Sequence, residues 1–521
     1  MKKNIQTFFI CIVILHGFIP GCSTVGEQND SLFGAKGQLS LFLAGPAEVF
    51  HDISFRVTAV NIISENGVSI PITTGPRDIS SLSISNGHSN LAESPLPVGT
   101  YTKLVFMINN ASIRSDGKVV QLTVTDESMT IPVNVMVKRQ QNTSLFVYWN
   151  PDESVTDDSI FRPVMTEQKK KQELSSALIY VTNELSDNVS VINRYSGEIV
   201  DTIMVGRQPK GIAASLSINR PRLFVANSGS DSITVIDPAN NSVENEIPVR
   251  YGTEPVDVTV ADISSEKKLL FVANYRSNSI SVIDLATYNE MEKIDVGSGP
   301  VALAADPPAD SLTVSRYLSV NDINELRSYR EKFINVYVVN QNSNNVSILR
   351  IDIISGRSTG VITLDVDWDP RDLYVDYIRG KVFVANYGSD KLSVINILKT
   401  LTSSSTEAVT SINNVGNHIT AITSDPDFDR IYLLRDSPPE IVTIRPSSNE
   451  NIQLQSMISP VLGRISVGTT PRSLTLDNEK RKIFAVNRGS DDIYVIDKTT
   501  RRTELKIPVG KRPYDIAVLP E

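Results

Sequence analysis

Two sets of charged residues recur behind prolines in the C-terminal two-thirds of the chain. Cations directly follow the proline, and acids lie one position further on: Lys210, Arg371, Arg472; Asp257, Asp372, Asp515. If the prolines come together, the cations can attract an anionic ligand, although the chain carries a net charge of −9. The acids are candidate binding residues of the same site, one position further along the chain. The plainer alternative is that these are paired surface charges that hold loops together.

Cysteine and histidine are too scarce for most other catalytic centres. The chain has 2 Cys and 4 His. Cys11 and His16 lie in an apolar N-terminal leader, and Cys22 directly follows it. Thiol catalysis, cysteine-based zinc sites and covalent haem attachment are therefore excluded. The remaining histidines are far apart in sequence, so we assign no catalytic residue, no metal ligand and no cofactor.

The N-terminus carries the pattern of a secretory leader. Lys2 and Lys3 precede the apolar run Ile5 to Leu15, which is too short to span a membrane comfortably, and Gly21 precedes Cys22. This resembles the bacterial lipobox, which implies a signal peptide over 1–21 and acyl chains such as palmitate on Cys22. Ser23 resembles the residue found in lipoproteins sent to an outer membrane. The alternatives are an uncleaved anchor or a secretory leader with an incidental Cys.

Two further segments precede the repeats. Residues 22–34 are polar and predict a tether. Residues 35–150 contain about seven β-rich segments, a density typical of a small β-sandwich. This segment resembles an uncharacterised N-terminal domain of bacterial lipoproteins, with a Gly-x-Leu strand and a Leu-Pro-x-Gly-x-Tyr turn at 96–101. The resemblance implies no activity. The charged residues 151–176 predict a linker.

One pattern recurs seven times over 177–521. It starts with a strand that ends in Asn, as in Tyr180-Val181-Thr182-Asn183, and a Ser before Asp or Asn follows three residues later, as in Ser230-Asp231. A second strand ends ten residues after the Asn, or after Arg435 in the degenerate copy, and this constant spacing fits a hairpin of fixed register. A third leads to Gly-x-x-Pro, as in 252–255, and a short apolar strand follows. We interpret the shared Asn and Ser as structural, with ligand contact as the alternative.

Four strands per repeat predict one propeller blade per repeat. The units, with Tyr-Val-Thr-Asn in the first copy, resemble the YVTN-type propeller repeat of bacterial surface and periplasmic proteins. The chain is therefore expected to be all-β, a seven-bladed β-propeller preceded by a β-sandwich. Because an open array would expose sheet edges, we expect the last strand, 513–518, to pair with the first, 179–183.

Connectivity separates two faces of the propeller. The Gly-x-x-Pro and Asn-x-x-Ser loops open on one face, which we call the short-loop face. Three long insertions fall on the other, the insertion face: 307–332, 397–408 and 446–462. The first insertion predicts a short capped helix from Asp322 to Arg330. The linker also enters there, so we expect the N-terminal domain to crowd the insertion face.

These features favour a binding or scaffold protein over an enzyme. We expect a monomeric lipoprotein of the cell envelope, on the periplasmic or surface side of an outer membrane, whose partner is a protein or an envelope polymer. The alternative is a hydrolase, because lactonases and several periplasmic oxidoreductases resemble this repeat and a carboxylate-bound metal in the central channel can hydrolyse a lactone. No nucleic-acid partner is expected, because no basic cluster is interleaved with aromatics.

Overall fold

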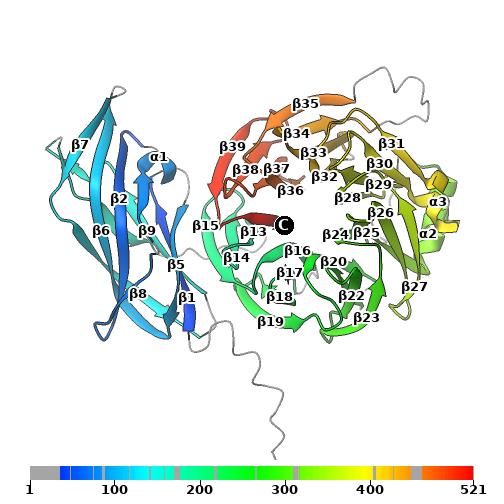
Figure 1. The fold of residues 1–521 in the computed structure, drawn as a ribbon, viewed down its shortest axis with the longest axis horizontal. Helices are drawn as coiled ribbons and strands as arrows, with labels where there is room; N and C mark the ends of the chain where they lie inside the picture. The colour runs from blue at the N-terminus through cyan, green and yellow to red at the C-terminus, as the bar shows by residue number, and fades with distance from the viewer. Residues whose placement is uncertain are drawn as a thin grey trace, which may run out of the picture.

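The computed structural model is almost entirely β-structure, with a ring of sheets beside a smaller β domain (Figure 1). It describes residues 36–519 except 47–48, 74, 85–87, 116–117, 140–141, 158, 169–176, 216–219, 265–266, 309–314, 316, 403–405, 426 and 447–459. The expected signal peptide, Cys22 and the tether lie outside the described residues. No helix of the described part of the chain is long and apolar enough to cross a membrane.

The N-terminal domain is a β-sandwich, as the sequence predicts. One sheet has the order β12-β9-β1-β5, and the other β10-β11-β7-β6-β2-β3 with β4 on β2 and β8 on β6. Their apolar faces share one core, in which Leu41, Phe55 and Trp149 are buried. The elements are β1 (Lys36–Ala44), β2 (Asp52–Ser64), β3 (Ser69–Pro71), β4 (Arg77–Ser80), α1 (Ser81–Ile84), β5 (His88–Pro97), β6 (Gly99–Ser115), β7 (Lys118–Val124), β8 (Ser128–Val137), β9 (Asn142–Asn150), β10 (Val155–Thr156), β11 (Ile160–Phe161) and β12 (Val164–Gln168).

The sandwich continues beyond the predicted boundary at residue 150. Strands β10, β11 and β12 belong to its two sheets, so the segment expected as a linker is structured up to Gln168. Phe161 is fully buried, with its ring 5.2 Å from that of Phe55, and Met165 joins the same core. The charges that suggested a linker alternate with these apolar residues, as Glu167 does with Met165. The lysines at 169–171 fall outside the described residues.

Within the described residues, seven four-stranded antiparallel sheets follow the sandwich. Each inner strand contacts the inner strands of the sheets on either side, so the sheets close into a ring (Figure 1). From the inside outward the sheets are β40 (Pro513–Val518), β13 (Leu178–Asn183), β14 (Asn188–Asn193), β15 (Ile199–Met204); β16 (Pro209–Ser215), β17 (Arg222–Asn227), β18 (Ser232–Asp237), β19 (Ser242–Pro248); β20 (Pro255–Asp262), β21 (Lys268–Asn274), β22 (Ser279–Asp284), β23 (Asn289–Asp295); β24 (Pro300–Ala305), β25 (Phe333–Asn340), β26 (Asn345–Asp352), β27 (Ser358–Asp365); β28 (Pro370–Asp376), β29 (Lys381–Asn386), β30 (Leu392–Asn396), β31 (Val409–Ile412); β32 (Ile419–Asp425), β33 (Arg430–Asp436), β34 (Pro439–Ile444), β35 (Val461–Ser466); and β36 (Pro471–Asp477), β37 (Lys482–Asn487), β38 (Asp492–Asp497), β39 (Thr503–Pro508).

The two ends of the repeat region complete one sheet together. Strand β40 pairs antiparallel with β13, with Val518 opposite Ile179 and Ile516 opposite Val181. The predicted closure is therefore confirmed. It removes the two edges that an open array would leave unpaired.

The Ser-Asp or Ser-Asn pair of the repeat holds the loops of the short-loop face. Ser230 Oγ accepts from Arg207 N at 3.1 Å, which joins the β17–β18 loop to the loop that enters β16 of the same sheet. The next residue, Asp231, accepts from Glu254 N at 2.7 Å, and Glu254 belongs to the loop entering the following sheet. The same bond, from a backbone N–H to an Asp or Asn side chain of the preceding sheet, recurs four times: Gln208 to Asp187, Gly299 to Asn278, Asp369 to Asn344 and Arg512 to Asp491. The five accepting Asp and Asn residues have positive φ, which Asp and Asn tolerate better than most residues.

The repeated Asn is a buried structural residue. Asn274 Nδ2 donates to Ser281 Oγ at 2.8 Å, seven residues later in the facing strand. The same bond recurs in Asn183, Asn227, Asn340 and Asn386. The Gly of Gly-x-x-Pro packs directly on this amide: a Cβ on Gly252 would lie 2.1 Å from Asn274 Nδ2. The structural interpretation of Asn and Ser is therefore confirmed.

The sandwich lies against the rim of the ring, beside β15 (Figure 1). The prediction that it crowds the insertion face is therefore wrong. Phe42 and Phe146 stack at 5.1 Å and join the apolar cluster that contains Ile199. Ser144 Oγ donates to Asp201 at 2.9 Å, and Asn188 donates to Glu93 at 2.8 Å. The physical reason is the composition of β15, which is mostly apolar (Ile-Val-Asp-Thr-Ile-Met) and is buried along its whole length. The equivalent β19 (Ser-Val-Glu-Asn-Glu-Ile-Pro) is polar and exposes four consecutive residues.

Two insertions carry the helices of the propeller. Helix α2 (Val320–Arg330) confirms the predicted capped helix, because Ser319 accepts from Asp322 N and Asp322 bonds back to Ser319 N. Helix α3 (Ile397–Thr402) contacts α2, and the 3-10 turn η3 (Thr406–Ala408) follows it. Counted from the axis outward, the insertion with α2 connects the first and second strands of one sheet, β24 and β25. The insertion with α3 connects the third and fourth strands of the next, β30 and β31. Their described parts therefore lie on the insertion face.

Gly252→Ala should destabilise the propeller, because the added Cβ would collide with the buried Asn274 amide. We expect a loss of about 2 kcal/mol in the free energy of unfolding. Gly360→Ala is the matched control, because nothing lies within 4 Å of a Cβ built there. Its effect should stay within about 0.5 kcal/mol. Denaturation of both variants in parallel checks this, and equal stability would contradict the packing role of the repeat glycine.

Candidate functional site

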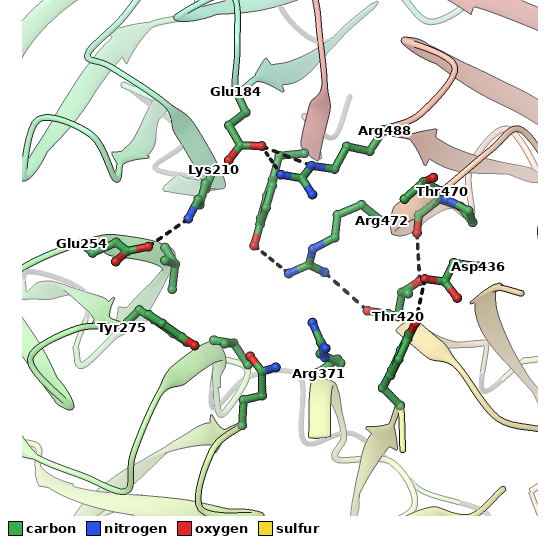
Figure 2. Close-up of a pocket in the computed structure, with 16 residues that line it drawn as sticks. Glu184, Lys210, Glu254, Tyr275, Arg371, Thr420, Asp436, Thr470, Arg472 and Arg488 are labelled. Atoms are coloured by element: carbon green, nitrogen blue, oxygen red, sulfur yellow. Dashed lines mark hydrogen bonds and ion pairs between the residues drawn. The ribbon is translucent and has the colours of Figure 1, made fainter. Parts of the chain in front are cut away.

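A cavity of about 290 Å³ lies on the axis of the ring, at the short-loop face (Figure 2). We call it the axial cavity. Every inner strand supplies a lining residue from the same repeat position: Lys210, Val256, Val301, Arg371, Thr420, Arg472 and Tyr514. A second repeat position directly follows the repeat Asn, or Arg435 in the copy that lacks the Asn, and it supplies Glu184, Tyr275, Gln341, Tyr387, Asp436 and Arg488. Sequence positions far apart therefore meet because equivalent positions of a ring converge at its axis.

The structure brings the three cations predicted from the sequence together in the axial cavity. Two of them have carboxylate partners. Lys210 Nζ lies 3.4 Å from Glu254, and Arg371 donates two bonds of 2.9 Å to Asp369. Arg371 also stacks on a tyrosine, with its guanidinium carbon 4.7 Å from the Tyr387 ring centroid. For these two cations, the paired-charge interpretation describes the local geometry.

The third cation, Arg472, is bound by neutral groups. Its Nη2 donates to the Tyr514 hydroxyl at 2.9 Å and its Nη1 to the Thr420 carbonyl at 3.4 Å. No carboxylate of the described residues lies within ion-pair distance. Burial lowers the pKa of Arg472, but the interactions with Tyr514 and with the charges of Asp372 and Asp515 outweigh it and raise the pKa overall. Arg472 is therefore a charged guanidinium that points into the axial cavity (Figure 2).

Sequence reasoning missed two other groups of this site. Arg488 pairs with Glu184 across neighbouring sheets, through Nε at 3.2 Å and a closer Nη2 contact. The Tyr514 ring lies among three cations: its centroid is 4.5 Å from Arg472, 5.8 Å from Arg488 and 5.9 Å from Lys210 Nζ. For Arg488 the available signal was the position directly after the repeat Asn, here Asn487. Tyr514 follows Pro513 at the same repeat position as the predicted cations, and it was missed because only charged residues were considered there.

The three predicted acids are not among the residues that line the axial cavity. Each accepts a hydrogen bond from a backbone N–H of the next inner strand: Asp257 from Leu303 at 2.9 Å, Asp372 from Ile422 at 2.9 Å, Asp515 from Ile212 at 3.1 Å. These carboxylates therefore bind adjacent sheets to one another. Their predicted role in ligand binding receives no support from this geometry.

Burial changes the titration of these acids. It raises the pKa of Asp372 to about 6, against hydrogen bonds and the charge of Arg472, which lower it. Burial also raises the pKa of Asp515, and that of Asp257 still further, where the Asp515 charge adds to the effect. The burial of Asp257 is tight, because a Cβ on Gly211 of the neighbouring sheet would lie 2.4 Å from Asp257 Oδ1.

No group of three His, Cys, Asp or Glu side chains within the described ranges could hold a metal ion. A calcium site needs oxygen ligands that converge on one point. Asp257, Asp372 and Asp515 bond instead to three different strands.

Comparisons with known proteins show the fold. No family model matches the chain, and no curated protein matches its sequence. Among solved structures, a functionally unknown protein from Desulfotomaculum acetoxidans is 14% identical, with a TM-score of 0.51 over 66% of this chain and 100% of that one. Kuenenia stuttgartiensis hydrazine synthase is 17% identical (TM-score 0.46; 62% and 92%). A putative 6-phosphogluconolactonase from Bacteroides uniformis is 13% identical (TM-score 0.46; 66% and 99%). At such identities, likeness describes architecture and not activity.

Asp372→Asn should flatten the dependence of stability on pH. The folded-state pKa of about 6 lies above the ordinary 3.8, so the contribution of Asp372 is fully present below about pH 4 and is lost as the pH rises through 6. This difference corresponds to about 3 kcal/mol. Denaturation midpoints from pH 4 to 7.5 check the slope. Asp295→Asn, at a side chain that is 85% exposed, is the control. Equal slopes in wild type and Asp372→Asn would contradict the expectation.

Proposed function

We propose that the chain is a membrane-anchored, extracytoplasmic lipoprotein whose propeller is a binding platform for a protein or a cell-envelope polymer. The binding surface in this proposal is the short-loop face around the axial cavity. The observation that carries it is the convergence of four cations from three different sheets on one cavity that opens to solvent: Lys210, Arg371, Arg472 and Arg488.

The placement of the other elements supports this choice of face. Helices α2 and α3 lie on the insertion face, and the sandwich packs at the rim. Trp368, in the loop that enters β28, is 69% exposed and lines a second cavity of about 270 Å³ with Asn344 and Asp365. An exposed Trp beside polar groups is typical of a recognition surface, because its large ring buries much area on contact.

The proposal favours binding over catalysis because the acids near the axis are used in the fold. A lactone hydrolase of the kind considered from the sequence needs a carboxylate-bound metal, and Asp257, Asp372 and Asp515 accept backbone hydrogen bonds instead. The membrane anchor rests on the sequence pattern around Cys22. It places the protein on an outer membrane, facing the periplasm or the cell surface.

Cys22→Ser should release the protein into the soluble fraction, because the acyl chains would have no attachment site. Fractionation of cells that express the full chain, followed by immunoblotting, measures this. The control is Ser23→Ala, which keeps the thiol and should stay with membranes. Membrane attachment of the Cys22→Ser variant would contradict the lipid anchor.

Reversing the charge of the short-loop face should abolish partner capture. The variant carries Lys210→Glu, Arg371→Glu and Arg472→Glu in the mature full-length chain, and binding partners are captured from envelope extracts and identified by mass spectrometry. The matched control reverses three cations of the insertion face, exposed in the structure: Lys332, Arg357 and Arg502. Loss of the same partners in both variants, or in neither, would contradict the face assignment.

A further inference from the structure

The four cations of the axial cavity differ in how their charge is balanced. Lys210, Arg371 and Arg488 each have a carboxylate within ion-pair distance: Glu254, Asp369 and Glu184. Arg472 has none within that distance among the described residues, and its two hydrogen-bond acceptors are a hydroxyl and a carbonyl. The charges of Asp372 and Asp515 act on it only from beyond ion-pair distance. A cation that already has a carboxylate partner gains less from an added anion than one bound by neutral groups.

The hydrogen bonds of Arg472 leave donors free for a ligand. Each terminal nitrogen of a guanidinium carries two N–H groups. The bonds to Tyr514 and Thr420 use one from each nitrogen, so one N–H remains on each. Two N–H groups of this kind form the fork that binds a carboxylate or phosphate through two bonds. The fork is also held in place, because Arg472 stacks at 4.5 Å on the Tyr514 ring.

The surroundings limit the size and the character of the ligand. A volume of about 290 Å³ is at the small end of ligand pockets. Tyr275, Tyr387 and Tyr514 supply walls with an apolar ring and a polar hydroxyl, and Glu184, Glu254 and Asp436 supply acceptors. Such a lining fits one ring-sized, hydroxyl-bearing unit with an anionic group better than an apolar ligand.

We propose that Arg472 is the anchor of a specific anion site, at which it binds the carboxylate or phosphate group of a sugar-sized ligand entering from the short-loop face. The inference rests on the proposed function, because it names the ligand class of the same surface. The ligand is either free or a pendant unit of an envelope polymer, since both present the same group to Arg472.

Titration calorimetry on the mature full-length chain tests the site with three probes: glucuronate, inorganic phosphate and glucose. The wild type should bind at least one of the two anions, and glucose more weakly. Glucuronate alone indicates a carboxylate ligand, and phosphate indicates a phosphate ligand. Arg472→Gln should lower the affinity for the bound anion about 10-fold or more, because a charged bidentate contact is lost. Arg472→Lys should recover only part of this affinity, because it keeps the charge without the fork.

Two other variants separate a specific site from a general positive field. Arg371→Gln, at a cation already paired with Asp369, should weaken the anion several-fold less than Arg472→Gln. Arg357→Gln, on the insertion face, should leave the affinity unchanged. If Arg472→Gln does not fold, Tyr514→Phe replaces it: this variant keeps the cation but removes the hydroxyl that orients it, and should also weaken binding.

The outcomes for this site and for the platform are distinct. Failure of the wild type to bind either anion, or equal losses in Arg371→Gln and Arg472→Gln, overturns the anion site. Partner capture that still depends on the short-loop face would then leave the platform standing. If the wild type binds an anion but the charge-reversal variant still captures the same partners, the platform is overturned and the anion site is supported.

Discussion

Hydrogen bonds from one sheet to the next hold the ring and set the geometry of everything at its axis. In five loops, the backbone N–H of the residue before proline donates to an Asp or Asn side chain of the preceding sheet, at 2.7–2.9 Å. The proline and the residue after it are thereby fixed at the start of the inner strand. That next residue lines the axial cavity, so the bond that joins two sheets also aims a side chain such as Lys210 or Arg371.

Successive positions of the inner strand therefore have different roles. The residue after proline faces the cavity and varies from Val301 to Arg472 without disturbing the ring. The residue after that lies where sheets meet, and there the choice is narrow: either an Asp that bonds the next strand, as Asp257 does, or a small residue, as at Gly211. This division lets the lining evolve charge and shape while the contacts between the sheets persist.

Much of the architecture could be predicted because it is repeated. Constant spacing between Asn183 and Asn193, and its copies, defines strands, faces and the β13–β40 closure, and the cations after proline converge as the ring requires. Predictions failed where a segment is determined by its contacts with another part of the molecule, which the repeat pattern does not reveal. The apolar strand β15 signals a docked sandwich only in comparison with the charged β19, and the core role of Phe161 is hidden in a charged segment. Whether Asp372 points to a ligand or to a neighbouring strand is a matter of side-chain direction, which composition does not encode.

The propeller ring is complete only once β40 has paired with β13. Asp515 N donates to Thr182 Oγ1, a residue 333 positions earlier. A chain made from its N-terminus onward can fold the sandwich and cover β15 early, but β13 has no inner neighbour until residues 513–518 have been made. Closure of the ring therefore depends on a contact of very long range in sequence, which makes it a slow step of folding, and removal of residues 513–518 would leave the inner edge of β13 unpaired.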